Sequence, residues 1–354
     1  MPKEITHWIA AERIRNLIEP GSIKEAIRKK PLFYYLGAVI YDSPFYAYGV
    51  KHTGTFKEIA ERLHDGVEGD TFEPIRAFIS SLPANPPDEG LSFIAGVFTH
   101  YSMDVTFHPM VNYFSGKYAS DDPAKRIDAQ VRHRTLEGLM DLYFSGIYAK
   151  ESDCSSAVGL GSCLINRGHF SRVLKGLLKN GEDVDEMVGR LYGIDLLEIP
   201  IRPLLNCHGL IQRQLFRPLL SAGLNLAGKI VGGPLAVIAS TFYPALKTRA
   251  LLTPSSTFKF FAAPIVFTHP NTGEALRGSA EDLAARAAMT AADLINGYQD
   301  LLKYGKGGSY LTGKRGLSLS YGCDVAQYPE PVHFDTDTPI HELCRVPCPP
   351  GNMP

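Results

Sequence analysis

Neither sign of charge is in excess in this sequence of 354 residues, which holds 36 basic and 37 acidic side chains. Bulk electrostatic attraction to nucleic acid is therefore not expected. The six cysteines are dispersed and none forms a Cys-x-x-Cys pair, so a disulfide scaffold is not expected in a chain of this length. Glycine and proline follow no repeating period, and the sequence shows no internal repeat.

Long apolar runs are also missing. The longest uncharged one lies between Lys229 and Lys247 and is interrupted by glycine and proline. It falls short of the roughly 20 residues that a membrane-spanning helix needs, so we expect no transmembrane segment. We interpret it as a buried core helix, with an interfacial segment lying on lipid as the alternative. The first residues lack the apolar stretch of a secretory signal, so we expect a cytoplasmic protein.

No strand-like alternation is sustained anywhere, whereas helical spacing of apolar residues recurs along the chain. The sequence therefore predicts an all-α, multi-helical fold. We expect one helical domain over residues 1–304, with an apolar addition at about 205–262, and an irregular Gly- and Pro-rich extension over 305–354. The clearest predicted helices cover residues 4–18, 22–30, 55–63, 91–108, 125–150 and 279–304, with Pro109 ending or kinking the fourth and Ser279 capping the last.

Three metal-binding residue types lie on the predicted helix 91–108. His100, Asp104 and His108 follow one another at a spacing of four residues, so their side chains share one helical face. Imidazole and carboxylate groups one turn apart form a donor set that suits zinc. The carboxylate between two histidines can also bridge two metal ions, with one oxygen on each.

A second helix, 125–150, repeats this pattern with His133, Glu137 and Asp141. The histidine and glutamate can hold one metal ion, while Asp141 is placed to support a ligand through a hydrogen bond. A single histidine on a helix is more often a core or surface residue than a ligand. The occurrence of ligand types at helical spacing on two helices favours a metal site over two ordinary helix faces.

The order of these groups resembles the zinc-dependent phospholipase C family of bacteria, whose fold is shared with single-strand-specific zinc nucleases. The family pattern opens with a histidine on a helix near the N-terminus. It continues with an aspartate in an aromatic-rich loop, a histidine soon after, and the two helix patterns described above. The resemblance covers about residues 5–145 and rests on Thr6, His7, Trp8, Asp42, His52, His100, Asp104, His108, Pro109, His133 and Glu137.

The resemblance implies two or three zinc ions per chain. In the family, the third ion is completed by an N-terminal tryptophan, and no tryptophan precedes His7 here. His64 competes with His52 as a ligand; we prefer His52 because the Gly-Thr-Phe that follows it fits the family. The implied ligand sets are Asp42, His52, His100 and Asp104 for one ion, His108, His133 and Glu137 for a second, and His7 with the bridging Asp104 for a third.

By this resemblance the protein is a zinc-dependent phosphodiester hydrolase, in which Asp42 orients or deprotonates the attacking water. The expected substrate is a phospholipid or related amphiphile, and the apolar addition at 205–262 would give peripheral membrane contact. Two alternatives stay open: a single-strand nuclease on the same metal fold, against which the near-neutral charge argues, and an inactive, metal-stabilised binding protein.

Overall fold

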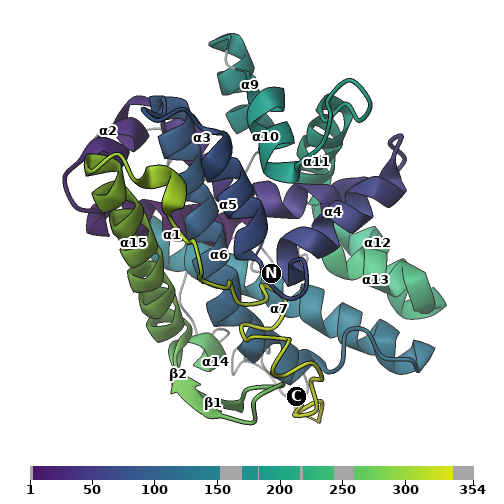
Figure 1. The fold of residues 1–354 in the computed structure, drawn as a ribbon. Helices are drawn as coiled ribbons and strands as arrows, with labels where there is room; N and C mark the ends of the chain where they lie inside the picture. Colours follow the sequence, from purple (N-terminus) through teal and green to yellow (C-terminus); the bar gives the residue numbers. More distant parts are fainter. Residues whose placement is uncertain (1–2, 152–169, 182, 216–217, 243–258, 338–354) are drawn as a thin grey trace.

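The structure, a computed structural model, describes residues 3–337 except 152–169, 182, 216–217 and 243–258. These residues form mainly α-helices, which confirms the predicted fold class (Figure 1). The helices are α1 (Glu4–Leu17), α2 (Ser22–Lys29), α3 (Pro31–Gly37), α4 (Thr53–Asp65), α5 (Phe72–Ser81), α6 (Asp88–Ser115), α7 (Pro123–Glu151), α9 (Phe170–Lys179), α10 (Val184–Tyr192), α11 (Arg202–Leu215), α12 (Pro218–Val231), α13 (Gly233–Thr241), α14 (Lys259–Ala262) and α15 (Ala280–Lys303). Two 3-10 turns, η1 (Ile40–Tyr46) and η3 (Gly307–Ser309), and two strands, β1 (Ile265–Thr268) and β2 (Ala275–Gly278), complete the elements.

Several local predictions can be compared with these bounds. Ser279 caps α15 through a capping box with Asp282, as predicted. Asp42 lies in the turn η1 rather than in an open loop. The antiparallel pair β1–β2 was not expected, because four residues per strand are too few to show a clear alternation of polar and apolar residues.

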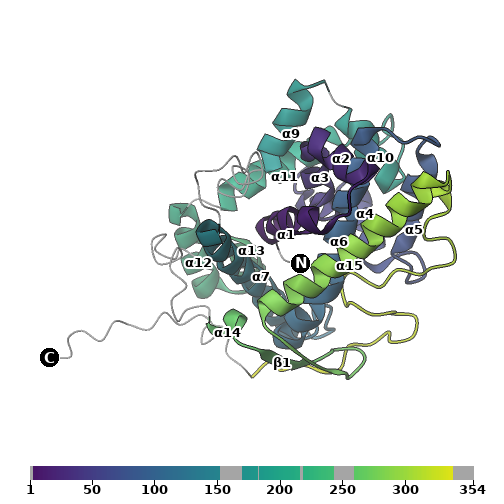
Figure 2. The same cartoon turned by 90° about the vertical axis from the view of Figure 1, so that its left-hand side faces the viewer.

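Helix α6 lies at the centre of the fold (Figures 1 and 2). Helices α1, α2, α3, α7 and α15 all pack against it. Side chains are buried all around α6, including Phe93, Val97, Phe98 and Phe107. A helix surrounded in this way need not have one apolar stripe. Polar groups on α6 are therefore inside the protein, where each needs a partner.

A glycine contact sets the distance between α3 and α6. A Cβ atom on Gly96 would lie 2.1 Å from the carbonyl oxygen of Tyr34, and one on Gly37 would lie 2.2 Å from that of Phe93. The two helices can therefore approach only because both positions lack a side chain. This approach brings the chain that follows α3, including η1, against the middle of α6.

Helix α6 continues through Pro109, so of the two predicted outcomes, an end or a kink, the end of the helix was wrong. Proline removes the hydrogen bond to the carbonyl of Val105, four residues earlier. Gly322, which has a φ of 72°, packs against that carbonyl and against the Pro109 ring. The remainder of α6 is held by its buried surroundings, which outweigh the local cost of the proline.

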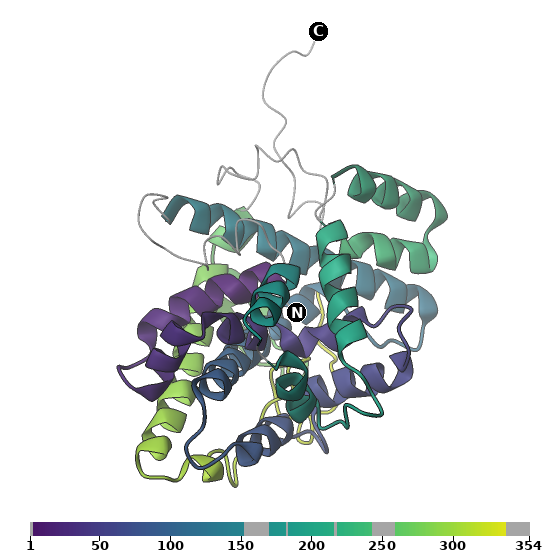
Figure 3. The ribbon, with the colours of Figure 1, turned by 90° about the horizontal axis from the view of Figure 1, so that it is seen from above.

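The helical pair α12–α13 lies at the edge of the molecule, beside α7 (Figures 1 and 3). It contains the described part of the long apolar run, which breaks at Gly232 rather than forming one core helix. Ile230 and Val231 are 75% and 70% exposed, and Leu226 is 61% exposed. The prediction of one buried core helix is therefore wrong for this part, although Val237 and Ala239 on α13 are buried. Residues 216–217 and 243–258 of the apolar addition lie outside the described residues.

The described part of the C-terminal extension follows an irregular path that is nevertheless tied to the helical core. The backbone of Leu319 donates to the carbonyl of His64 on α4, and its own carbonyl bonds to His108 on α6. Asn112 donates to the carbonyl of Ser320. Residues 338–354 lie outside the described residues, and the division of the chain at residue 304 stays a prediction.

Placing a methyl group at the α3–α6 contact tests the packing. We expect Gly96→Ala to lower the free energy of unfolding by about 1–3 kcal/mol, because two backbones must separate. Gly54→Ala on α4, where nothing lies within 4 Å of the new Cβ, is the control and should leave stability unchanged or slightly higher. Urea denaturation of both variants measures the difference. Equal stability of Gly96→Ala and wild type would contradict the close approach.

Candidate metal centre

Two groups of metal-binding side chains meet along α6. The first contains Asp42, His64, His100 and Asp104, and the second contains His108, His133 and Glu137. Within each group, one potential ligand atom from every residue lies within 4.8 Å of the others. The shared helical face of His100, Asp104 and His108, predicted from their spacing, therefore faces side chains from three other elements: η1, α4 and α7.

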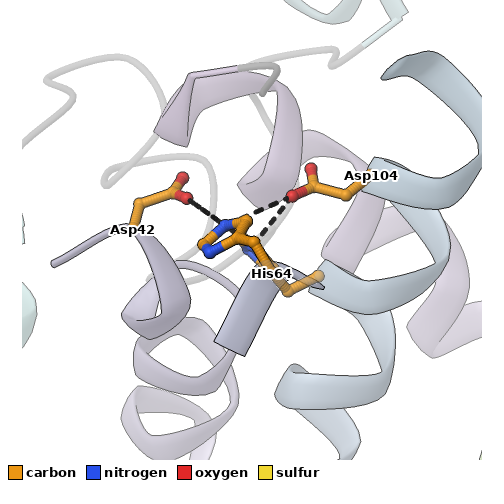
Figure 4. A group of neighbouring side chains, drawn as sticks. Asp42, His64 and Asp104 are labelled. Carbon is orange, nitrogen blue, oxygen red and sulfur yellow. Dashed lines mark ion pairs between the residues drawn. The ribbon is translucent and has the colours of Figure 1, made fainter. Parts of the chain in front are cut away.

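The first group is almost completely buried, and Asp104 is at its centre. The Nε2 atom of His100 lies 3.2 Å from Asp104 Oδ2, and His64 Nε2 lies 3.8 Å from the same oxygen. Asp42 Oδ1 lies 3.4 Å from His64 Nε2 and 3.7 Å from His100 Nε2. Figure 4 shows His64 between the two carboxylates.

His7 approaches Asp104 from the opposite side. Its Nε2 atom lies 3.3 Å from Asp104 Oδ1, and its ring stacks on that of His100 with centroids 4.3 Å apart. The two oxygens of Asp104 thus face different histidines, with His7 on one oxygen and His64 and His100 on the other. This is the geometry expected of a bridging carboxylate.

Three histidines of the two groups are oriented by backbone carbonyls. His64 Nδ1 bonds to the carbonyl of Ala60 at 2.8 Å, and His100 Nδ1 to that of Ala38 at 3.0 Å. His108 Nδ1 bonds to the carbonyl of Leu319. A carbonyl only accepts, so Nδ1 carries the proton in each neutral ring and the Nε2 lone pair faces inwards. This second bond is typical of histidines that bind metal.

The second group lies nearer the surface. His133 Nε2 is 2.8 Å from Glu137 Oε1, and the rings of His108 and His133 stack with centroids 5.6 Å apart. The side chains of His133 and Glu137 are 12% and 9% exposed, whereas Asp104 and His100 are inaccessible. The centre therefore has a buried side and a side that solvent can reach.

Asp141 supports the centre through the backbone of α1. It accepts bonds from the amide nitrogen of Thr6 at 2.9 Å, the Thr6 hydroxyl at 2.5 Å and the amide nitrogen of Ile5 at 3.3 Å. These amides belong to the first turn of α1, where the acceptor four residues earlier that serves the rest of a helix is not available; the Thr6 amide also donates to the carbonyl of Lys3 at 3.1 Å. The carboxylate thus caps α1 from α7 and fixes the turn that carries His7.

Burial and neighbouring charges shift the pKa values in opposite directions across the centre. Burial lowers the pKa of His100, but the charges of Asp104 and Asp42 outweigh it and raise the value to about 9. Burial would raise the pKa of Asp104, but the charges of His100 and His108 hold it well below its usual range. Burial lowers the pKa of His108 to about 3 and holds that of His133 well below its usual range. The imidazoles of the second group are therefore neutral, whereas the carboxylates of the first group attract positive charge.

The donor set fits a divalent cation. Asp42 Oδ1, His100 Nε2 and both oxygens of Asp104 are buried without a hydrogen-bond partner among the described residues. Buried carboxylates facing imidazole lone pairs repel one another unless a proton or a cation lies between them. Nitrogen and oxygen donors in this arrangement suit zinc.

The structure brings together the predicted site residues except His52. His52 is the residue before α4, whereas His64 is in the last turn of that helix, about 18 Å further along the axis. The C-terminal end of α4 is the end that meets the first group, so His64 takes part in it and His52 belongs to neither group. Sequence spacing could not decide between them, because they lie at opposite ends of the same helix.

The fold and this centre define a helical protein with a candidate carboxylate–histidine metal site between its helices. Residues 6–175 match the family model described as zinc dependent phospholipase C, which supports the family that the sequence predicted. Searches of curated proteins and of solved structures give no significant match.

Comparing the two histidines of α4 tests the ligand assignment. We expect His64→Ala to weaken binding of zinc at least about tenfold, because the first group loses a donor. His52→Ala should bind zinc as the wild type does. Competition titration against a zinc chelator measures both affinities. The reverse order of the two variants would restore His52 as the ligand.

Proposed function

We propose that this protein is a zinc-dependent phosphodiester hydrolase of the phospholipase C type, which acts on a phospholipid or a related amphiphile. The single observation that carries this proposal is the environment of Asp104. Both of its oxygens are buried and accept no hydrogen bond from a described residue; one faces His7 on α1, and the other faces His64 on α4 and His100 on α6 itself. The match of residues 6–175 to a zinc-dependent family supports zinc as the cation that this environment requires.

In the proposed centre, His64 takes the place predicted for His52. His7 is set beside the bridging Asp104, so the chain offers a partial third site and two or three ions per chain are expected. The proposed ligands are Asp42, His64, His100 and Asp104 for one ion, His108, His133 and Glu137 for a second, and His7 with Asp104 for a third.

Zinc, when bound, neutralises phosphate oxygens and lowers the pKa of a water ligand towards about 7. The protein's own part is to orient the reactants and to accept a proton. Asp42 is suited to this role because its Oδ1 is buried and accepts no hydrogen bond from a described residue. The oxygen therefore has a free lone pair with which to orient or deprotonate the attacking water.

The surroundings of the centre favour an amphiphilic substrate. Phe45 is 45% exposed, and its ring lies 5.0 Å from that of His64, so an apolar contact is offered beside the first group. Arg134, next to His133, bonds to the carbonyl of Val237 and to Thr241 on α13. The apolar pair α12–α13 is thus anchored beside the accessible side of the centre. No described helix is long and apolar enough to cross a membrane, so lipid contact would be peripheral.

The proposal predicts that the zinc-loaded protein releases a phosphorylated head group from phospholipid vesicles and that Asp42→Asn loses this activity. At saturating zinc, we expect Asp42→Asn to remain loaded through its amide oxygen and the other ligands, and to lower kcat at least about 100-fold, because the amide cannot accept the proton. Asp128→Asn, an exposed change on α7 with the same loss of charge, is the control and should keep wild-type activity. Zinc content and head-group release are measured on the same samples.

Three results would contradict parts of this account. Cleavage of single-stranded nucleic acid without lipid hydrolysis would favour the nuclease alternative. Bound zinc with neither activity would favour a metal-stabilised binding protein. Wild-type kcat in Asp42→Asn would remove Asp42 from the reaction.

The exposed apolar residues of α12–α13 predict a dependence on the lipid surface. We expect the double variant Ile230→Asp, Val231→Asp to bind phospholipid vesicles at least about tenfold more weakly, because two apolar side chains no longer enter the lipid. Hydrolysis of a short-chain, soluble phosphodiester should be unchanged. Leu197→Asp, at a residue that is 94% exposed on another part of the surface, is the control. Equal vesicle binding by the double variant and wild type would exclude this contact.

A further inference from the structure

A second buried polar cluster lies directly beside the proposed metal centre. The hydroxyl of Ser43 lies 2.8 Å from His208 Nδ1, and His208 Nε2 lies 3.0 Å from Glu4 Oε1. The three residues come from η1, α11 and α1, which are far apart in the sequence. The carboxylate of Glu4 only accepts, so Nε2 carries the proton of the neutral ring and Nδ1 accepts from the Ser43 hydroxyl.

This cluster has the order of a nucleophile, a base and a carboxylate, but it is closed to substrate. Ser43 and His208 are inaccessible, and Glu4 is 1% exposed. The His208 ring is stacked between Tyr46 and Phe170, with centroids 4.1 Å and 3.9 Å away. A serine that no substrate can reach does not act as a nucleophile. The cluster therefore has to act through its neighbours.

The neighbour of Ser43 is Asp42, and both belong to η1. A 3-10 turn has weaker hydrogen bonds than an α-helix, and this one contains Pro44, which donates none. The turn is held from outside: Tyr192 on α10 donates to the carbonyl of Ile40 at 2.6 Å, and His208 holds Ser43. Both supporting residues lie beyond the segment that matches the family model.

The other end of the cluster fixes α1. Glu4 is in the first turn of α1, which also carries His7. Glu4 accepts hydrogen bonds from His208 and from the Tyr46 hydroxyl. Helix α1 is therefore joined to η1 twice, through His208 to Ser43 and directly to Tyr46 at the end of the turn. The cluster thus connects the turn that holds Asp42 to the helix that holds His7.

We propose that Ser43, His208 and Glu4 form a positioning network that fixes η1 against α1 and so holds Asp42 opposite His64 and His100. This proposal rests on the proposed zinc centre. The region beyond residue 175 is then an integral part of the site rather than an addition to it. His208 is a positioning residue, because it touches neither the expected substrate nor the expected metal.

Zinc affinity of single variants tests the network. We expect Ser43→Ala and His208→Leu to weaken zinc binding about 10- to 100-fold, the range observed when hydrogen-bond partners of metal ligands are removed. Ser43→Ala removes one hydroxyl and is the smallest perturbation. His208→Gln retains one donor and one acceptor and should bind zinc more tightly than His208→Leu. The probe is zinc alone, in competition with a chelator.

Gln212→Leu is the matched control for the packing of α11. Gln212 is buried one turn after His208, and its side-chain oxygen accepts from the backbone of Phe170 rather than from η1. Thermal unfolding of the zinc-free proteins should show a comparable loss of stability for Gln212→Leu and His208→Leu, while only His208→Leu loses zinc affinity.

The network is overturned if Ser43→Ala and His208→Leu bind zinc as the wild type does, or if Gln212→Leu weakens zinc binding equally. Activity is measured separately on phospholipid vesicles. Wild-type protein that binds zinc without cleaving phospholipid overturns the proposed reaction, while the zinc affinities still decide the network. Wild-type protein that binds no zinc overturns both.

Discussion

The carboxylate of Asp104 is buried in the middle of the protein, and its charge must be compensated there. The groups around it are imidazoles with inward-facing lone pairs and a second carboxylate, from Asp42. Such a collection is stable only when positive charge lies within it, as a proton or as a metal ion. Helices α1, α4 and α6 and the turn η1 all meet at Asp104. A cation is therefore needed at the point where these elements pack together. The match of residues 6–175 to a zinc-dependent family supports zinc as this cation.

The backbone geometry that allows this arrangement is set by close contacts. Gly37 and Gly96 let α3 and α6 approach, which places η1 beside His100. Asp141 caps α1 and fixes His7, and in the network proposed here His208 fixes Asp42. The buried group near Asp104 is thereby rigidly supported, while the group at His133 remains accessible beside α12–α13. The first group is almost completely buried, the second is partly exposed, and the apolar pair α12–α13 borders the second. This arrangement is consistent with the proposed reaction on a phosphodiester in a lipid layer.

The sequence predicted those features that depend on local periodicity. The spacing of His100, Asp104 and His108 on one helix placed three site residues correctly on one face, and the capping box at Ser279 marked the start of α15. Features that depend on distant contacts were not predictable. His52 and His64 lie at opposite ends of α4, and only the packing of this helix shows which end meets Asp42. Helix α6 passes Pro109 because Gly322 and the core enclose it, and His208 meets Ser43 across 165 positions. The exposure of Ile230 and Val231 likewise depends on what α12 and α13 pack against.

Anomalous X-ray diffraction at the zinc absorption edge, on crystals of the zinc-loaded protein, tests the central claim most directly. The account predicts one anomalous peak among Asp42, His64, His100 and Asp104 and another among His108, His133 and Glu137, each about 2.0–2.2 Å from the ligand atoms. Peaks at neither position, or zinc bound at His52 instead of His64, would contradict it.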